Sequence, residues 1–293
     1  MFYCIFVVQI LTITNSNDLN THQYKIMSSI KIAIPDNQFY LPILKNCDSV
    51  ASQNNFSIIR TSEQQCAELL LTNRVDIALI SPLAYGEAVG QVDYRIIPAS
   101  AVSAEGFTGI ASVYFSPFLQ TIETIAVPNP DDFITLAGRL VLIEKFDIHT
   151  TIVPATGTLD ELLAKADAAI VWNNPTLPPS SLDITEEWMD AFENPLPIAL
   201  WVCRPEELPD NITDIINSFA ADNLPATQII HDHDCDSPES HENAFGEFRE
   251  GAMFWKWSDK TEEWLDQTLD ALFYHSFIPA IPNVKVFGRD AVE

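Results

Sequence analysis

The sequence predicts an α/β protein with two lobes and a ligand cleft between them. Short apolar runs alternate with helical segments from Lys31 onward, and this alternation is typical of a mostly parallel sheet covered by helices. The alternation occurs in two successive units, and the last third of the chain returns towards the first unit. We therefore expect one lobe to contain residues 28–102 plus 203–293 and the other residues 103–202. Clefts between lobes are preferred sites for small ligands.

The N-terminal residues 1–26 are predicted to be disordered or wrongly assigned to the protein. Met1 to Ile13 is apolar, but no Lys or Arg precedes this run and no small-residue cleavage site follows it. It is also shorter than the about 20 apolar residues of a membrane-spanning helix, so we expect no stable membrane span. Met27 directly precedes the first clean strand. We expect a start there and a cytoplasmic location, with export as the alternative if residues 1–26 act as a signal.

The first unit is predicted to contain strands at 31–34, 56–60 and 75–80, with helices beginning near Gln38 and covering 62–72. Two further strand-like segments, 94–100 and 109–115, are joined by residues 103–108. We interpret this connection as a loop, in which Gly106 permits a backbone turn close to a ligand. An ordinary hairpin loop is the alternative.

The second unit is predicted to contain strands at 124–127 and 150–153, with helices at 131–146 and 159–165. Residues 166–204 then indicate a buried strand, an irregular loop, a helix and a second buried strand. Asp183 or Thr185 is suited to cap that helix, and Pro195 ends it. Beyond Arg204 we expect helices at 208–221 and 260–275 around an acidic segment.

Polar residues follow several of the predicted strands. In open α/β sheets, ligands bind outside the carboxyl ends of the strands. Asn37 and Ser81 stand just past two strands of the first unit, and Asn173 begins the loop that runs to Asp183 in the second. The sequence therefore predicts that these strand ends form the walls of a site.

The composition excludes several classes of function. Asp and Glu number 41 against 15 Lys and Arg, which gives a formal net charge of -26 and leaves no basic surface for nucleic acid. Apolar residues make up 47% of the chain, enough for a sizeable core. The five cysteines share no close spacing, so we expect reduced thiols rather than a disulfide framework or a zinc site.

The segment from His231 to Glu242 carries two further histidines and several carboxylates. These are metal-ligand types, but metal sites need ligands fixed at set distances, which an unpatterned loop seldom supplies. We therefore expect a mobile, solvated segment without a functional metal, and adventitious divalent binding is the alternative. No phosphate-binding glycine loop, nucleophile elbow or zinc-protease motif occurs.

Five segments together resemble the menaquinone-biosynthesis family of the futalosine pathway, which includes chorismate dehydratase and dihydroxynaphthoate synthase. The segments are VDIALISPLAYG, SAEGFTGIASVYFS, ADAAIVWNNP, SLDITEEW followed by LPIALWVCR, and FYHSFIPAIPNVKVF. The resemblance covers residues 31–288. It implies a periplasmic-binding-protein-like (type 2) two-lobe fold, a cleft for a small carboxylic acid, and no metal or organic cofactor.

This chain departs from the family at two places that concern ligand charge. Asp131 and Asp132 stand at a helix start where the family tends to have Ser or Thr, and carboxylates there oppose an anionic ligand. Asn173 and Asn174 replace the family's Gly-Asp, so an acidic group has become an amide that cannot take a proton.

The resulting hypothesis is a chorismate dehydratase-like lyase that acts on a small carboxylated ring compound, with Glu105 as the catalytic base. The alternative is a non-catalytic solute-binding or sensing protein with the same cleft. Because of the two departures, we expect poor turnover of chorismate and a less anionic ligand. The predicted ligand-binding residues are Asn37, Ser81, Ser103, Gly106, Asn173, Asn174 and Asp183.

Overall fold

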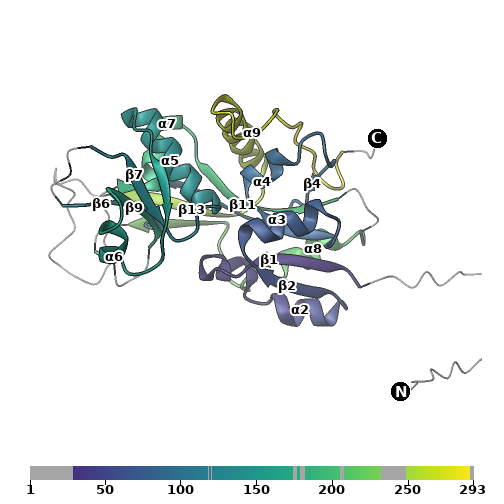
Figure 1. The fold of residues 1–293 in the computed structure, drawn as a ribbon. Coiled ribbons are helices and arrows are strands. Elements are labelled where there is room, and N and C mark those ends of the chain that lie inside the picture. The colour runs from purple at the N-terminus through teal and green to yellow at the C-terminus, as the bar shows by residue number, and fades with distance from the viewer. Residues whose placement is uncertain are drawn as a thin grey trace, which may run out of the picture.

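The structure is a computed structural model (Figure 1), and it describes residues 29–117, 119, 121–173, 177–178, 182–204, 208–231 and 249–290. Three expectations fall outside the described residues. They are the disorder of residues 1–26, the role of Asn174, and the properties of the acidic segment beyond His231.

The first lobe is built on an eight-stranded sheet with the order β12-β13-β5-β11-β3-β1-β2, and β4 pairs with β11. Its strands are β1 (Lys31–Pro35), β2 (Ser57–Thr61), β3 (Ile77–Ile80), β4 (Arg95–Ile96), β5 (Ser100–Gly106), β11 (Leu196–Cys203), β12 (Thr227–His231) and β13 (Glu250–Lys256). Its helices are η1 (Gln38–Tyr40), α1 (Leu41–Leu44), α2 (Cys47–Gln53), α3 (Glu63–Leu71), α4 (Pro82–Glu87), α8 (Ile212–Asn217) and α9 (Asp259–Tyr274).

The second lobe is built on a five-stranded sheet with the order β10-β6-β9-β7-β8. Its strands are β6 (Ala111–Phe115), β7 (Thr124–Val127), β8 (Thr151–Pro154), β9 (Ala168–Trp172) and β10 (Leu182–Asp183). Its helices are α5 (Phe133–Phe146), α6 (Leu159–Leu163) and α7 (Ile184–Phe192). In Figure 1 this sheet lies at one end of the molecule, β1 and β2 lie at the other, and β11 runs between them.

The two sheets confirm the predicted two-lobe α/β fold class, but the expectation of mostly parallel sheets is wrong. Within the described chain, β1 pairs in parallel with β2 and β3, and β7 pairs in parallel with β8 and β9. The pairs that involve β5, β6 and β11 are antiparallel. Alternation predicts parallel pairing only where a helical crossover joins two neighbouring strands. β11 instead arrives from α7 of the other lobe and enters between β5 and β3.

The prediction of a loop at residues 103–108 is wrong for its first four residues, because β5 continues as a strand to Gly106. Ser103 pairs with Pro197 of β11 on one side and with Phe254 of β13 on the other. Strand β13, which the sequence reading missed, thus supplies the partner that extends β5. It pairs in turn with β12, a second missed strand.

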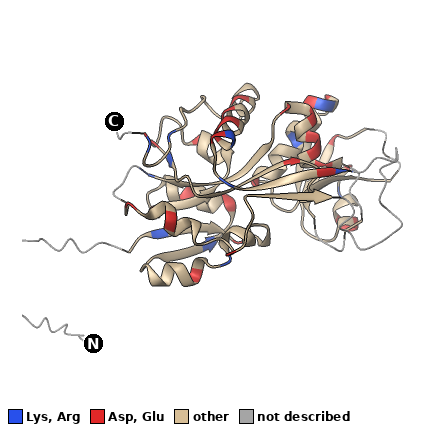
Figure 2. Ribbon diagram, turned by 180° about the vertical axis from the view of Figure 1, so that it is seen from behind, with Lys and Arg blue, Asp and Glu red and all other residues tan. Residues whose placement is uncertain are grey.

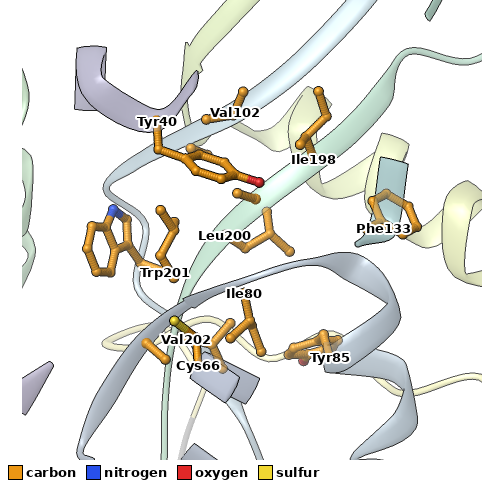
Figure 3. Packing of buried hydrophobic residues seen from close by; sticks show 14 of the residues in the cluster. Tyr40, Cys66, Ile80, Tyr85, Val102, Phe133, Ile198, Leu200, Trp201 and Val202 are labelled. Atoms are coloured by element: carbon orange, nitrogen blue, oxygen red, sulfur yellow. The ribbon is translucent and has the colours of Figure 1, made fainter. Parts of the chain in front are cut away.

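The core is continuous across both lobes. All eight residues of β11 are buried, which explains their unbroken apolar pattern. Figure 3 shows Ile198, Leu200 and Val202 of this strand among the buried side chains, together with Tyr40 of the first lobe and Phe133 of the second.

Surface charge follows the composition. Figure 2 shows Asp and Glu distributed over the helices of both lobes, with few Lys and Arg between them. Among the helices that the structure describes, none has the length and apolar character needed to cross a membrane.

Candidate functional site

A cavity of about 810 Å³ lies between the two lobes. The first lobe contributes the turn after β1 and the start of α3, and the second contributes the start of β6, the approach to α5 and the end of β9. The carboxyl ends of β1, β2 and β9 therefore open into one space, as the strand-end argument predicts for this fold class.

Glu63 is placed in this cavity by the way α3 begins. Ser62 caps the helix, since its Oγ accepts a hydrogen bond from the amide of Gln65 at 3.2 Å, so Glu63 becomes the first helical residue after β2. The hydroxyl of Tyr40 donates to Glu63 Oε1 at 2.6 Å, and the amide of Phe133 from the second lobe donates to Oε2 at 3.4 Å. Glu63 therefore contacts both lobes.

The protonation of Glu63 is strongly perturbed. Glu63 is a partly exposed residue of the cavity wall, yet desolvation by the surrounding protein raises the pKa of its carboxyl to about 7. The nearby Asp132 raises the pKa of Glu63 further, while the bonds from Tyr40 and Phe133 oppose the rise. Such a group exchanges protons close to neutral pH, which is what general acid–base chemistry needs.

Asp132 faces Glu63 from the second lobe. It is the N-cap residue of α5, but its side chain makes no capping hydrogen bond and instead accepts one from Trp172 Nε1 at 3.2 Å. Desolvation by burial raises the pKa of Asp132, and the bond from Trp172 opposes this rise. The cavity thus holds two carboxyl groups whose pKa values are both raised, first by desolvation.

An aromatic wall stands beside the carboxyl pair. The rings of Phe39 and Trp172 come from opposite lobes, with centroids 4.8 Å apart. Trp172 ends β9, and its bond to Asp132 fixes the indole. Flat apolar surface next to a proton-exchanging pair suits a small ring compound.

Two of the predicted ligand-binding residues line this cavity. Asn37 caps η1 by accepting a hydrogen bond from Phe39 N at 3.0 Å. Asn173 Nδ2 donates to Gly109 O at 2.9 Å and to Ser112 Oγ at 2.8 Å, so its donor side is occupied within the second lobe. Their contact with a ligand stays a prediction.

Ser81 lies elsewhere, on a second cavity of about 540 Å³ on the other side of α3. Its Oγ accepts a hydrogen bond from Ala84 N at 3.3 Å and caps α4. Asp131 also lines this second cavity, whereas Asp132 lines the first. Glu63 borders both cavities. Asn37 and Ser81, which were predicted to lie at one site, therefore line two cavities on opposite sides of α3.

Ser103, Glu105 and Gly106 belong to β5, not to a loop at the cavity. Ser103 is 1% exposed, and its Oγ has no hydrogen-bond partner among the described residues. Glu105 is half-buried and pairs with Ala252 of β13, and none of the cavities described above includes it. Its role as catalytic base remains a prediction.

Asp183 is fully buried and organises the start of α7. Its Oδ1 accepts hydrogen bonds from the amides of Thr185 and Glu186, both at 3.1 Å, and its Oδ2 accepts one from Gly109 N at 2.9 Å. Desolvation raises the pKa of Asp183 to about 6, against the lowering effect of these bonds. The predicted capping role is confirmed, and direct contact with a ligand stays a prediction.

Glu63, Phe39 and Trp172 are the site residues that sequence reasoning missed. Ser62 and Glu63 follow β2 directly, so their position at a strand end is the sequence signal that points to Glu63. Trp172 reads as the end of a buried strand, and only its place opposite Phe39 makes it part of a site.

The fold defines a two-lobe α/β protein with a cavity between its lobes. The family model described as "Menaquinone biosynthesis" matches residues 31–233. The chain belongs to this menaquinone-biosynthesis family, as the sequence resemblance predicted.

Several solved structures are similar to this chain at low identity. Protein AF1704 from Archaeoglobus fulgidus is 16% identical, with a TM-score of 0.49, over 64% of this chain and 71% of that one. The alkanesulfonate-binding protein SsuA from Xanthomonas axonopodis pv. citri, bound to MOPS, is 10% identical, with a TM-score of 0.48, over 86% and 94%. The Candida albicans CA3427 gene product is 14% identical, with a TM-score of 0.44, over 66% and 71%. No curated protein matches the chain.

Proposed function

We propose that the chain is a chorismate dehydratase-like lyase that eliminates water from a small carboxylated ring compound in the inter-lobe cavity. The observation that carries the proposal is the Glu63–Asp132 pair, two carboxyl groups that approach each other from opposite lobes beside an aromatic wall. Family membership supports a place in menaquinone biosynthesis. A cytoplasmic location accompanies this proposal.

The pair can carry out both halves of an elimination. Ionised Asp132 takes the proton from the carbon next to an electron-withdrawing group, and the electrons of that C–H bond form the new double bond. Protonated Glu63 gives its proton to the departing hydroxyl, which leaves as water as the C–O bond breaks. Glu63 begins protonated and ends ionised, Asp132 does the reverse, and proton transfer between them restores the starting state.

The test is a panel of hydroxylated cyclohexene and cyclohexadiene carboxylic acids, including chorismate and shikimate, with loss of one water followed by mass spectrometry. We expect turnover of at least one panel member, and a decrease in kcat of about 10²-fold or more in Glu63→Gln and in Asp132→Asn. Glu105→Gln tests the other candidate base. Full activity in Glu63→Gln and Asp132→Asn, with loss in Glu105→Gln, would return the catalytic role to Glu105.

The alternative function is non-catalytic solute binding or sensing, and it accompanies export. One observation favours it: the described residues that line the cavity include three carboxyl groups, Asp36, Glu63 and Asp132, and no Lys, Arg or His. A cavity with this charge disfavours a dianionic substrate. Binding of panel members without any loss of water would support this alternative.

A further inference from the structure

Contacts between the two lobes meet at Glu63. Its Oε2 accepts a hydrogen bond from the amide of Phe133 in the second lobe at 3.4 Å, while its Oε1 accepts one from Tyr40 of its own lobe at 2.6 Å. The rings of Phe39 and Trp172 join the lobes across the same cavity, with centroids 4.8 Å apart. The surroundings of the Glu63 carboxyl therefore depend on where the second lobe lies.

The groups that face Glu63 offer an ionised carboxylate no neutralising charge. Glu63 borders two cavities, and their described lining residues include no Lys, Arg or His. The titratable neighbours of Glu63 in these cavities and in the adjoining elements are Asp36, Tyr40, Cys66, Glu87, Tyr94, Asp131 and Asp132. Ionisation of Glu63 thus adds a negative charge to a set of acids, phenols and a thiol.

Protonation of Glu63 and closure of the lobes are coupled through the second lobe. Desolvation raises the pKa of Glu63 most, the charge of Asp132 raises it further, and the bond from the Phe133 amide lowers it by a smaller amount. Separation of the lobes removes the effects of Asp132 and Phe133 and admits water, so the pKa falls. Because the closed form binds the proton more tightly, the proton favours the closed form by the same factor.

We propose that a proton on Glu63 regulates closure of the two lobes: the protonated carboxyl favours the closed cavity, and its ionisation favours the open form. The inference rests on the proposed function in one respect, since the elimination also begins with Glu63 protonated and Asp132 ionised. The closed form is then the form that is ready to react. Closure itself does not depend on turnover.

The pH range of the effect follows from Glu63 itself. Its pKa is about 7 in the closed form and approaches 4.5 when the carboxyl is solvated. The preference for the closed form is therefore complete below about pH 4.5 and is lost as the pH rises through about 7. We expect the ratio of closed to open molecules to fall by up to about tenfold between about pH 6 and pH 8.

The test is small-angle X-ray scattering of the full chain without ligand over this pH range. The radius of gyration of the natural protein should increase with pH. In Glu63→Gln, whose side chain stays neutral, the part of the increase that comes from Glu63 should be absent, while any response of other groups remains.

Two further variants separate the contact from net charge. Asp132→Asn keeps an acceptor oxygen for Trp172 Nε1 but removes the charge that raises the pKa of Glu63, so the transition should move to lower pH. Glu68→Gln removes an equal charge from an exposed position on the same helix and should behave as the natural protein does.

A radius that does not change with pH in the natural protein, or equal profiles in the natural protein and Glu63→Gln, would overturn the inference. A shift to lower pH of the same size in Glu68→Gln as in Asp132→Asn would also overturn it. The expected profiles without turnover of any panel member would contradict the proposed function alone. Turnover with equal profiles would contradict this inference alone.

Discussion

At the residue scale, Glu63 shows how burial turns an ordinary carboxyl into a group that titrates near neutrality. Its pKa is raised from 4.5 to about 7, first by desolvation and then by Asp132. The folded protein therefore binds a proton that the unfolded chain has released. The stabilising contribution is complete below about pH 4.5 and is lost as the pH rises through about 7.

We accordingly expect Glu63→Gln to flatten the dependence of stability on pH. The free energy of unfolding of the natural protein should fall by up to about 3 kcal/mol more than that of the variant between these pH values. Urea denaturation at a series of pH values measures the difference. Asp183, whose pKa is raised to about 6, contributes equally to both proteins and cancels. Parallel profiles would show that Glu63 is well solvated.

Asp183 tests the distinction between a capping residue and a ligand-binding one. Asp183→Ala removes the acceptor for the amides of Gly109, Thr185 and Glu186, so we expect a loss of about 2 kcal/mol or more. Asp183→Asn keeps an acceptor oxygen and should cost less. Thermal denaturation measures the stabilities, and titration with a member of the carboxylic acid panel measures ligand affinity. Weakened binding in Asp183→Asn with unchanged stability would instead support the predicted ligand contact.

At the element scale, the pairing of β5 with β13 depends on a glycine. Gly106 has φ +63°, and a Cβ atom there would lie 2.7 Å from the carbonyl oxygen of Glu250. The pairing of β5 with β13 at this position therefore requires a residue without a side chain.

We expect Gly106→Ala to destabilise the protein by about 2 kcal/mol or more, through backbone strain and a clash with the neighbouring strand. Gly90→Ala is the matched control, because Gly90 has φ +77° and open space around its Cα. Gly90→Ala therefore introduces backbone strain without a steric clash. Chemical denaturation measures both losses of stability. Equal losses in the two variants would show that β13 shifts to accommodate the added methyl group without a loss of free energy.

At the scale of the whole molecule, we propose lobes of residues 28–102 plus 203–293 and of residues 103–202. β5 and β11 belong to the sheet of the first lobe and carry the chain across these bounds, and we propose that they act as the hinge between the lobes. A contact between α9 and α5 crosses from one lobe to the other: His275 Nε2 lies 2.8 Å from Glu144 Oε1. The contact therefore joins the two lobes through a single pair of side chains.

Glu144→Gln removes the carboxylate of this contact, so we expect the lobes to separate more readily and the radius of gyration measured by small-angle X-ray scattering to increase. Glu187→Gln is the control. It removes an equal charge that pairs with Lys145 inside the second lobe. An unchanged radius in Glu144→Gln, or the same increase in both variants, would argue against a latch between the lobes.

The net charge of -26 makes self-repulsion a property of the whole molecule (Figure 2). We expect added NaCl to raise the melting temperature at neutral pH, because screening weakens repulsion among exposed carboxylates. The same salt series near the isoelectric point, about pH 4.3, should give a much smaller rise. A salt effect of equal size at both pH values would show that repulsion is not its cause.

The sequence alone determined the fold class, the family and most of the elements, because local patterns carry that information. Asp183 as the cap of α7, the buried run of β11 and the polar strand end at Asn173 follow from short-range chemistry. Only the tertiary structure decided which strand ends share a cavity. Glu63 and Asp132 are 69 positions apart in the numbering, and no local signal pairs them. Strand direction, the extension of β5 by β13 and the raised pKa of Glu63 likewise depend on groups brought together from distant parts of the chain, whose effects arise from burial and proximity.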